Sequence, residues 1–178
     1  MIGDRAACLK LLIDAGANLE ATDALSKTPL HEAAANGYPE LLSLLIQNGV
    51  NVNVTKYNLK TALHFAAFGR RGRATECVEL LLKAGAAVNA RSYDGSPFDI
   101  ALDHGHRRAY PLFLRAGAEF QNSYHNSYTL RVQGAGGFKK YAQNHLARMT
   151  KLFAANGRRV PPEVVRQIMK FWLHLGYY

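Results

Sequence analysis

The chain has 178 residues, of which 48% are hydrophobic, and a formal net charge of +9. It has no run of about eighteen apolar residues that could span a membrane, and its N-terminus lacks the basic segment and apolar run of a secretion signal. We therefore expect a soluble, intracellular protein of the cytoplasm or the nucleus.

The positive charge is concentrated toward the C-terminus. Residues 1–117 carry 13 Lys and Arg against 11 Asp and Glu, whereas residues 118–178 carry 9 against 2. Such an excess favours an acidic partner, a nucleic acid or an anionic surface, and it bears on association rather than on the fold.

Two sequence tracts recur through the first two thirds of the chain. The first is TPLHEAA at residues 28–34, which returns as TALHFAA at 61–67 and, more weakly, as SPFDIAL at 96–102. The second is a leucine-rich tract that ends in glycine, at residues 11–16, 44–49, 80–85 and 112–117. The spacing of 33 residues from Thr28 to Thr61 is typical of stacked structural repeats.

Each copy predicts two helices and an exposed finger. Thr or Ser caps the first helix, Pro suits its first position, and paired alanines allow close packing. A short turn at Gly37 or Gly105 leads to the second helix, whose leucines recur at helical spacing and which ends at a glycine such as Gly49. Segments 50–60 and 86–95 then form fingers that lead to the next copy.

Three irregularities interrupt this pattern. Residues 5–15 form a second-helix sequence without its first helix, so we expect the sequence to begin inside a repeat. The second copy has a three-residue insertion at residues 69–73, which predicts a longer turn on one face. Pro111 stands inside the second helix of the last copy, and we expect it to kink or shorten that helix.

The tract at residues 28–33 matches in full the Thr-Pro-Leu-His-x-Ala motif of the ankyrin repeat, and residues 61–66 match it at all but one position. The resemblance covers about residues 1–120. It implies an all-α ankyrin-repeat solenoid of about three and a half helix-turn-helix repeats, and a non-enzymatic interaction module or scaffold that binds a protein ligand. The family prefers glycine where this chain has Ser26 and Leu59, so the turns of the first two fingers are expected to deviate.

The resemblance also implies which residues contact a protein ligand on the concave surface of the fingers and first helices. Tyr57 and Phe68 are the strongest candidates, because aromatic anchors often dominate binding energy. The full set is Leu25, Lys27, Asn36, Tyr57, Lys60, Phe68, Tyr93, Asp103 and His104.

The segment after the repeats is predicted to contain a connector and two helices. Residues 121–136 lack hydrophobic periodicity and are expected to form a connector loop. In residues 137–178 the apolar side chains recur every three or four residues on either side of Asn156 and Gly157, which predicts a helical pair. We expect this pair to cap the open end of the solenoid.

The start of the second tail helix resembles the F-box-like element found behind ankyrin repeats, which docks an adaptor subunit of a ubiquitin ligase. This resemblance would make the chain a substrate receptor, with the repeats for the substrate and the tail for the ligase. The docking residues would be Pro161, Pro162, Glu163, Ile168 and Trp172.

Basic residues provide a third alternative. Arg70, Arg71 and Arg73 fall in the turn between the two helices of copy two, and Arg107 and Arg108 in the matching turn of copy three, so stacking predicts a basic patch. Arginine suits the recognition of carboxylate and phosphate, and with the basic tail the patch supports a binder of nucleic acid or another polyanion. A nucleic acid is the less favoured partner, because these turns lack the aromatic residues of a stacking platform.

The sequence favours neither catalysis nor a cofactor. His31 and His64 occupy the histidine position of the motif, where the side chain serves the fold. His104 and His106 flank Gly105, but no Cys or carboxylate cluster accompanies them at the spacing of a zinc site. We therefore expect no enzyme activity, no metal and no cofactor.

Overall fold

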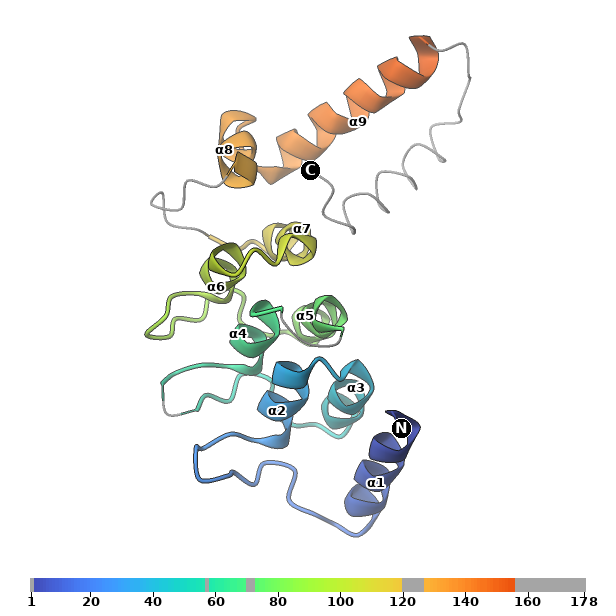
Figure 1. Ribbon diagram of the computed structural model, residues 1–178, viewed down its shortest axis with the longest axis vertical. Helices are drawn as coiled ribbons and strands as arrows, with labels where there is room; N and C mark the ends of the chain where they lie inside the picture. The colour runs from blue at the N-terminus through green and yellow to red at the C-terminus, as the bar shows by residue number, and fades with distance from the viewer. Residues whose placement is uncertain (1, 57, 70–72, 120–126, 156–178) are drawn as a thin grey trace. The chain divides into compact units, whose positions relative to one another are not determined.

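A computed structural model describes residues 2–56, 58–69, 73–119 and 127–155 (Figure 1). The chain separates into two compact units, Met1–Phe120 and Gln121–Tyr178. Within the described ranges all regular secondary structure is helical, apart from an isolated bridge between Ser92 and Gly95. The all-α class predicted from the sequence is confirmed.

The helices of the two units follow the predicted order. Those of the first unit are α1 (Ile2–Asp14), α2 (Pro29–Asn36), α3 (Pro39–Gln47), α4 (Ala62–Ala67), α5 (Ala74–Lys83), α6 (Pro97–Asp103), the 3₁₀ helix η1 (Arg107–Ala109) and α7 (Tyr110–Arg115). Those described in the second unit are α8 (Ser127–Gly134) and α9 (Phe138–Ala155).

The helices of the first unit form two columns (Figure 1). α2, α4 and α6, which we call the inner helices, stack on one another, and α3, α5 and α7, the outer helices, stack beside them. Fingers one, two and three, at residues 17–27, 50–60 and 86–95, project from the side of the inner helices. α1 packs against α3 and so extends the outer column.

Leucines and alanines of the repeated tracts fill the core between the columns. The fully buried leucines are Leu30, Leu42, Leu45, Leu63 and Leu81. Burial of one such side chain stabilises the fold by about 2 kcal/mol. The alanine pairs Ala33-Ala34 and Ala66-Ala67 are buried as well, where a larger side chain would hold neighbouring inner helices apart.

A buried histidine joins the start of each of the first two inner helices to the next finger. In copy one the N–H and the hydroxyl of Thr28 lie 3.2 and 3.0 Å from Nδ1 of His31. Nδ1 is therefore an acceptor, so Nε2 carries the proton and donates to the carbonyl of Lys60 at 3.1 Å. The expectation that the motif histidine serves the fold is confirmed for His31.

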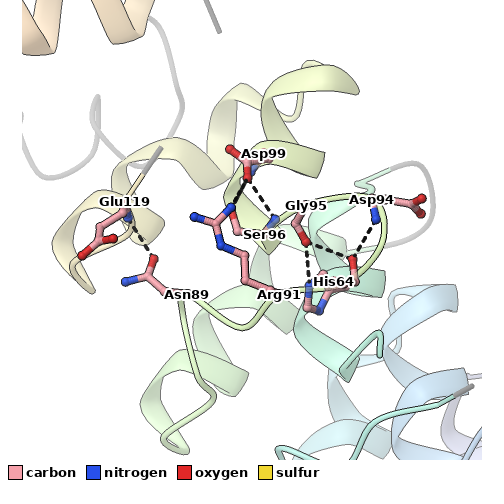
Figure 2. A network of polar contacts seen from close by, with 9 residues as sticks. His64, Asn89, Arg91, Asp94, Gly95, Ser96, Asp99 and Glu119 are labelled. Carbon is pink, nitrogen blue, oxygen red and sulfur yellow. Dashed lines mark hydrogen bonds and ion pairs between the residues drawn. The ribbon is translucent and has the colours of Figure 1, made fainter. Parts of the chain in front are cut away.

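His64 repeats this arrangement in copy two. Its Nδ1 faces the N–H and hydroxyl of Thr61 at 3.1 and 2.9 Å. Its Nε2 faces the carbonyl of Gly95 at 3.3 Å (Figure 2). Burial of the ring lowers the pKa of His64 to about 4, with a smaller contribution from Lys60. The neutral imidazole is thus the form that the folded chain holds.

Asp99 stands at the histidine position of copy three. Its Oδ2 accepts hydrogen bonds from the N–H and the hydroxyl of Ser96, at 2.9 and 2.8 Å, and lies 3.5 Å from Arg91 (Figure 2). Its Oδ1 is buried and has no hydrogen-bond partner in the part of the chain that the structure describes. The series of histidine donors therefore ends at copy two.

A second polar series fixes the base of each finger to the next copy. Glu20, Asn53 and Asn89 each accept a hydrogen bond from a main-chain N–H of the following copy, at Asn51, Ala87 and Glu119. Figure 2 shows the last of these, between Asn89 and Glu119. The amides of Asn53 and Asn89 also donate to the carbonyls of Gly85 and Gly117, at 3.3 and 3.1 Å. These bonds hold the fingers in register with the stack.

The turns at the finger tips are of two kinds. In fingers one and two, Ser26 and Leu59 adopt φ of 58° and 60°, the left-handed conformation that glycine favours, and the two turns share the same hydrogen bonds. Finger three has a tighter turn, in which Ser92 and Gly95 exchange two main-chain hydrogen bonds, because it is one residue shorter. Fingers one and two therefore share a turn that finger three does not have.

Pro111 shortens the last outer helix, as predicted. α7 has 6 residues, against 9 in α3 and 10 in α5. It begins at Tyr110, immediately after η1, so Pro111 lies in the first turn, where no main-chain donor is required.

The second unit corrects the predicted connector. We expected residues 121–136 to form a loop, but residues 127–134 form α8, which packs against α9 and in which Thr129 and Val132 are buried. Gly136 and Gly137 close the turn with φ of 79° and 104°. The second helix of the predicted tail pair lies outside the described residues.

Candidate protein-interaction face

The ends of the inner helices form the first part of the candidate site. Phe68 and His104 follow α4 and α6, and their ring centroids lie 3.9 Å apart at an interplanar angle of 48°. Phe68 keeps 39% of its surface exposed, and His104 and the neighbouring Asp103 are exposed. The stack thus brings two predicted contact residues of adjacent copies into one aromatic pair.

The finger tips form the second part. Leu25 of finger one and Tyr93 of finger three are both exposed, and Tyr93 exposes 78% of its surface. Leu59 of finger two is exposed as well. The sequence analysis did not name it as a contact residue, although an apolar side chain at a turn position that favours glycine could have indicated it. Apolar side chains therefore stand at the tips of all three fingers.

Charged side chains near the tips are paired rather than free. Lys27 lies 3.3 Å from Glu32 of α2, and Lys60 forms an ion pair with Asp94 of finger three. The hydrogen bond from Lys60 lowers the pKa of Asp94. Exposed pairs of this kind contribute about 1 kcal/mol or less each, so their main effect is to fix the direction of the lysines.

Phe65 is a further surface residue that the sequence analysis missed. The ammonium groups of Lys27 and Lys56 lie 5.9 and 5.4 Å from its ring centroid, and His31 packs edge-on against it at 5.6 Å. Phe65 occupies the variable position of the recurring tract, where copy one has Glu32. This change from a charged to an aromatic residue could have indicated a surface aromatic residue from the sequence alone.

A hollow of about 290 Å³ lies between the tips of fingers one and two. Ala24, Leu25 and Ser26 form one side, and Lys56 and Asn58 form the other. Its apolar wall and lysine rim suit a side chain that carries both an apolar body and an acidic end.

The predicted contact residue Asn36 lies at the end of α2. Its side-chain amide donates to the carbonyl and the carboxylate of Glu32, both at 2.9 Å.

Comparison with known families agrees with this architecture. A family model of ankyrin repeats, in three copies, matches residues 2–92, about half of the chain. The chain belongs to the ankyrin repeat family. Ankyrin repeats are generally protein-protein interaction modules and are typically non-enzymatic. Among curated proteins, none matches the sequence.

One arginine of the predicted basic patch, Arg73, pairs with other residues of the ankyrin stack. It forms ion pairs with Glu40 of the preceding copy and with Glu76, and its main-chain N–H donates to the carbonyl of Gly37. Arg107 and Arg108 are exposed on η1. Arg70 and Arg71 lie outside the described residues, as do Tyr57 and the F-box-like docking residues Pro161, Pro162, Glu163, Ile168 and Trp172.

The two histidines beside Gly105 have separate roles in the ankyrin repeats. His104 contacts Phe68, whereas His106 lies between copies two and three, 3.2 Å from the carbonyl of Ala67 and 2.9 Å from the hydroxyl of Thr75. Burial lowers the pKa of His106. Across the described ranges, no three metal-ligating residues converge, and no helix is long and apolar enough to cross a membrane.

Proposed function

We propose that the chain is a non-enzymatic scaffold that binds a protein ligand across the finger tips and the ends of the inner helices. The observation that carries the proposal is the Phe68–His104 pair, which stays exposed although the core beneath it is complete. Exposed aromatic side chains that are held in place by a neighbour bind a partner with little loss of conformational entropy.

The arrangement supports an extended contact rather than a single pocket. Leu25, Leu59 and Tyr93 offer one apolar side chain per finger, and Phe68 with His104 offers an aromatic surface at the helix ends. The paired lysines Lys27 and Lys60 would contribute direction more than affinity. We further propose that this surface belongs to a domain of residues 1–120 that acts separately from residues 121–178.

Replacing Phe68 by alanine is expected to reduce capture of the specific protein ligands about tenfold or more, as loss of an aromatic anchor commonly does. The measurement is quantitative mass spectrometry of proteins retained from a lysate by the immobilised full chain. Leu130→Ala is the matched control, because Leu130 is 48% exposed but belongs to α8 of the second unit.

The control variant should retain the ligands at the wild-type level, and thermal melting should show that both variants are folded. Equal retention by wild type and Phe68→Ala would contradict the proposed face. Loss of the ligands in Leu130→Ala alone would assign binding to the second unit instead.

A further inference from the structure

The hairpin of α8 and α9 contains a hollow of about 650 Å³ with a basic lining. Arg131 of α8 stands on one side, and Asn144, Arg148 and Lys151 of α9 on the other. Tyr141 and His145 lie between them, with their ring centroids 4.7 Å apart.

Within the described part of the second unit, no carboxylate side chain offsets the positive charge of this hollow. Residues 127–155 contain five Lys and Arg and no Asp or Glu. In the ankyrin stack, by contrast, Lys27, Lys60, Arg73 and Lys83 each form an ion pair with a carboxylate. An ordinary solvated helix face intersperses both signs, so a one-sign hollow favours an anionic ligand.

Cations from both helices act on the same ring. The pKa of His145 is lowered, first by burial and then by the charges of Arg148 and Arg131. Arg131 of α8 and Arg148 of α9 also line the same hollow, so a phosphate group within it would face guanidinium groups from both helices. Guanidinium groups also match phosphate oxygens with paired hydrogen bonds.

The basic face is longer than one phosphate group. Lys140, Asn144, Arg148 and Lys151 follow one another at intervals of three or four residues, which places them on one side of α9. At a rise of 1.5 Å per residue, Lys140 and Lys151 lie about 16 Å apart along the helix axis. A ligand with repeated phosphates could contact the whole row.

The uncharged lining disfavours a peptide ligand. Its apolar part consists of Ala135, Ala147 and the ring of Tyr141, which is 4% exposed, and its polar part of Asn144 and His145. A bound peptide normally inserts apolar or aromatic anchors into apolar pockets, whereas two alanines and one buried ring give this hollow little apolar surface. A buried ring also cannot stack on bases, so recognition would be of the backbone and independent of sequence.

We propose that the hollow between α8 and α9 binds the phosphodiester backbone of a nucleic acid. This site lies in the second unit and is independent of the proposed protein-interaction face. It also differs from the predicted patch of turn arginines, because its cations come from the tail hairpin.

The test is fluorescence anisotropy of the full chain with a labelled single-stranded oligonucleotide of about 20 nucleotides at several salt concentrations. The double variant Arg148→Gln/Lys151→Gln should bind about tenfold more weakly or worse. The charge-matched control Lys139→Gln/Lys10→Gln, at exposed positions outside the hollow, should stay within about threefold of wild type. The salt slope should fall by about 1.4 in the double variant alone, for two lost phosphate contacts.

Equal weakening in both double variants would overturn the proposal in favour of general attraction to a basic protein. Displacement of the oligonucleotide by poly-glutamate, or tighter binding to anionic lipid vesicles, would overturn it in favour of an acidic protein or a membrane. Arg131→Gln, on the other helix, is the second variant in case the double variant does not fold, and it should also weaken binding. Phe68→Ala should leave oligonucleotide binding unchanged.

Discussion

Replacing Gly69 by alanine is expected to lower the free energy of unfolding by about 3 kcal/mol, whereas the same change at Gly105 is expected to cost about 1 kcal/mol. Both glycines have left-handed backbones, with φ of 64° and 65°. A Cβ atom at position 69 would clash with the ring of His106, while at position 105 it would meet nothing within 4 Å.

His106 cannot easily move away from such a methyl group. Its two ring nitrogens are hydrogen-bonded to the carbonyl of Ala67 and the hydroxyl of Thr75 in copy two. Displacing the ring therefore breaks the two hydrogen bonds that His106 makes with that copy. Each bond contributes about 1 kcal/mol, and the left-handed backbone adds about 1 kcal/mol of strain for alanine.

Urea unfolding of the two glycine variants measures this difference. Equal losses at Gly69 and Gly105 would show that the ring does not lie where the structure places it. In a His106→Ala background the two alanine substitutions should become equally costly, because the clash at position 69 is then gone.

The second large effect concerns pH. The pKa of His64 falls to about 4 on folding, and burial lowers the pKa of His31 and His106 in the same direction. A histidine of this kind binds its proton more readily in the unfolded chain, where its pKa is about 6.5. Its contribution to stability is therefore complete above pH 6.5 and is lost as the pH falls toward 4.

His64 alone is expected to remove about 2 kcal/mol of stability between pH 7.5 and pH 5. The measurement is the free energy of unfolding in urea at the two pH values. In His64→Gln this pH-dependent loss should shrink by about 2 kcal/mol, whereas His104→Gln, at an exposed position, should leave it unchanged. A loss that is the same in wild type and His64→Gln would contradict a buried neutral imidazole.

The sequence alone predicted the helical stack because the repeated tracts specify it locally. Thr28 and Thr61 mark helix starts, the alanine pairs mark close helix contacts, and the spacing of the copies predicts which helices adjoin.

Features that depend on side chains meeting across copies were not predicted. Glu20, Asn53 and Asn89 each follow a helix-ending glycine by four residues, a regular signal whose meaning appears only once the register of the stack is known. The sequence analysis counted Arg73 as part of a basic patch, because its ion pair with Glu40 of the preceding copy is also visible only in the folded stack. α8 was missed because its sequence lacks hydrophobic periodicity, whereas in the structure the helix packs against α9.

Site-specific photo-crosslinking tests most directly whether the finger side of the ankyrin repeats binds the protein ligand. A photoreactive phenylalanine would replace Tyr93, which is 78% exposed on finger three, or Lys83, whose side chain is 70% exposed on the outer helix α5. Position 93 should form specific adducts with the ligands that Phe68→Ala fails to retain, and position 83 should form none. Adducts from position 83 and none from position 93 would contradict the account.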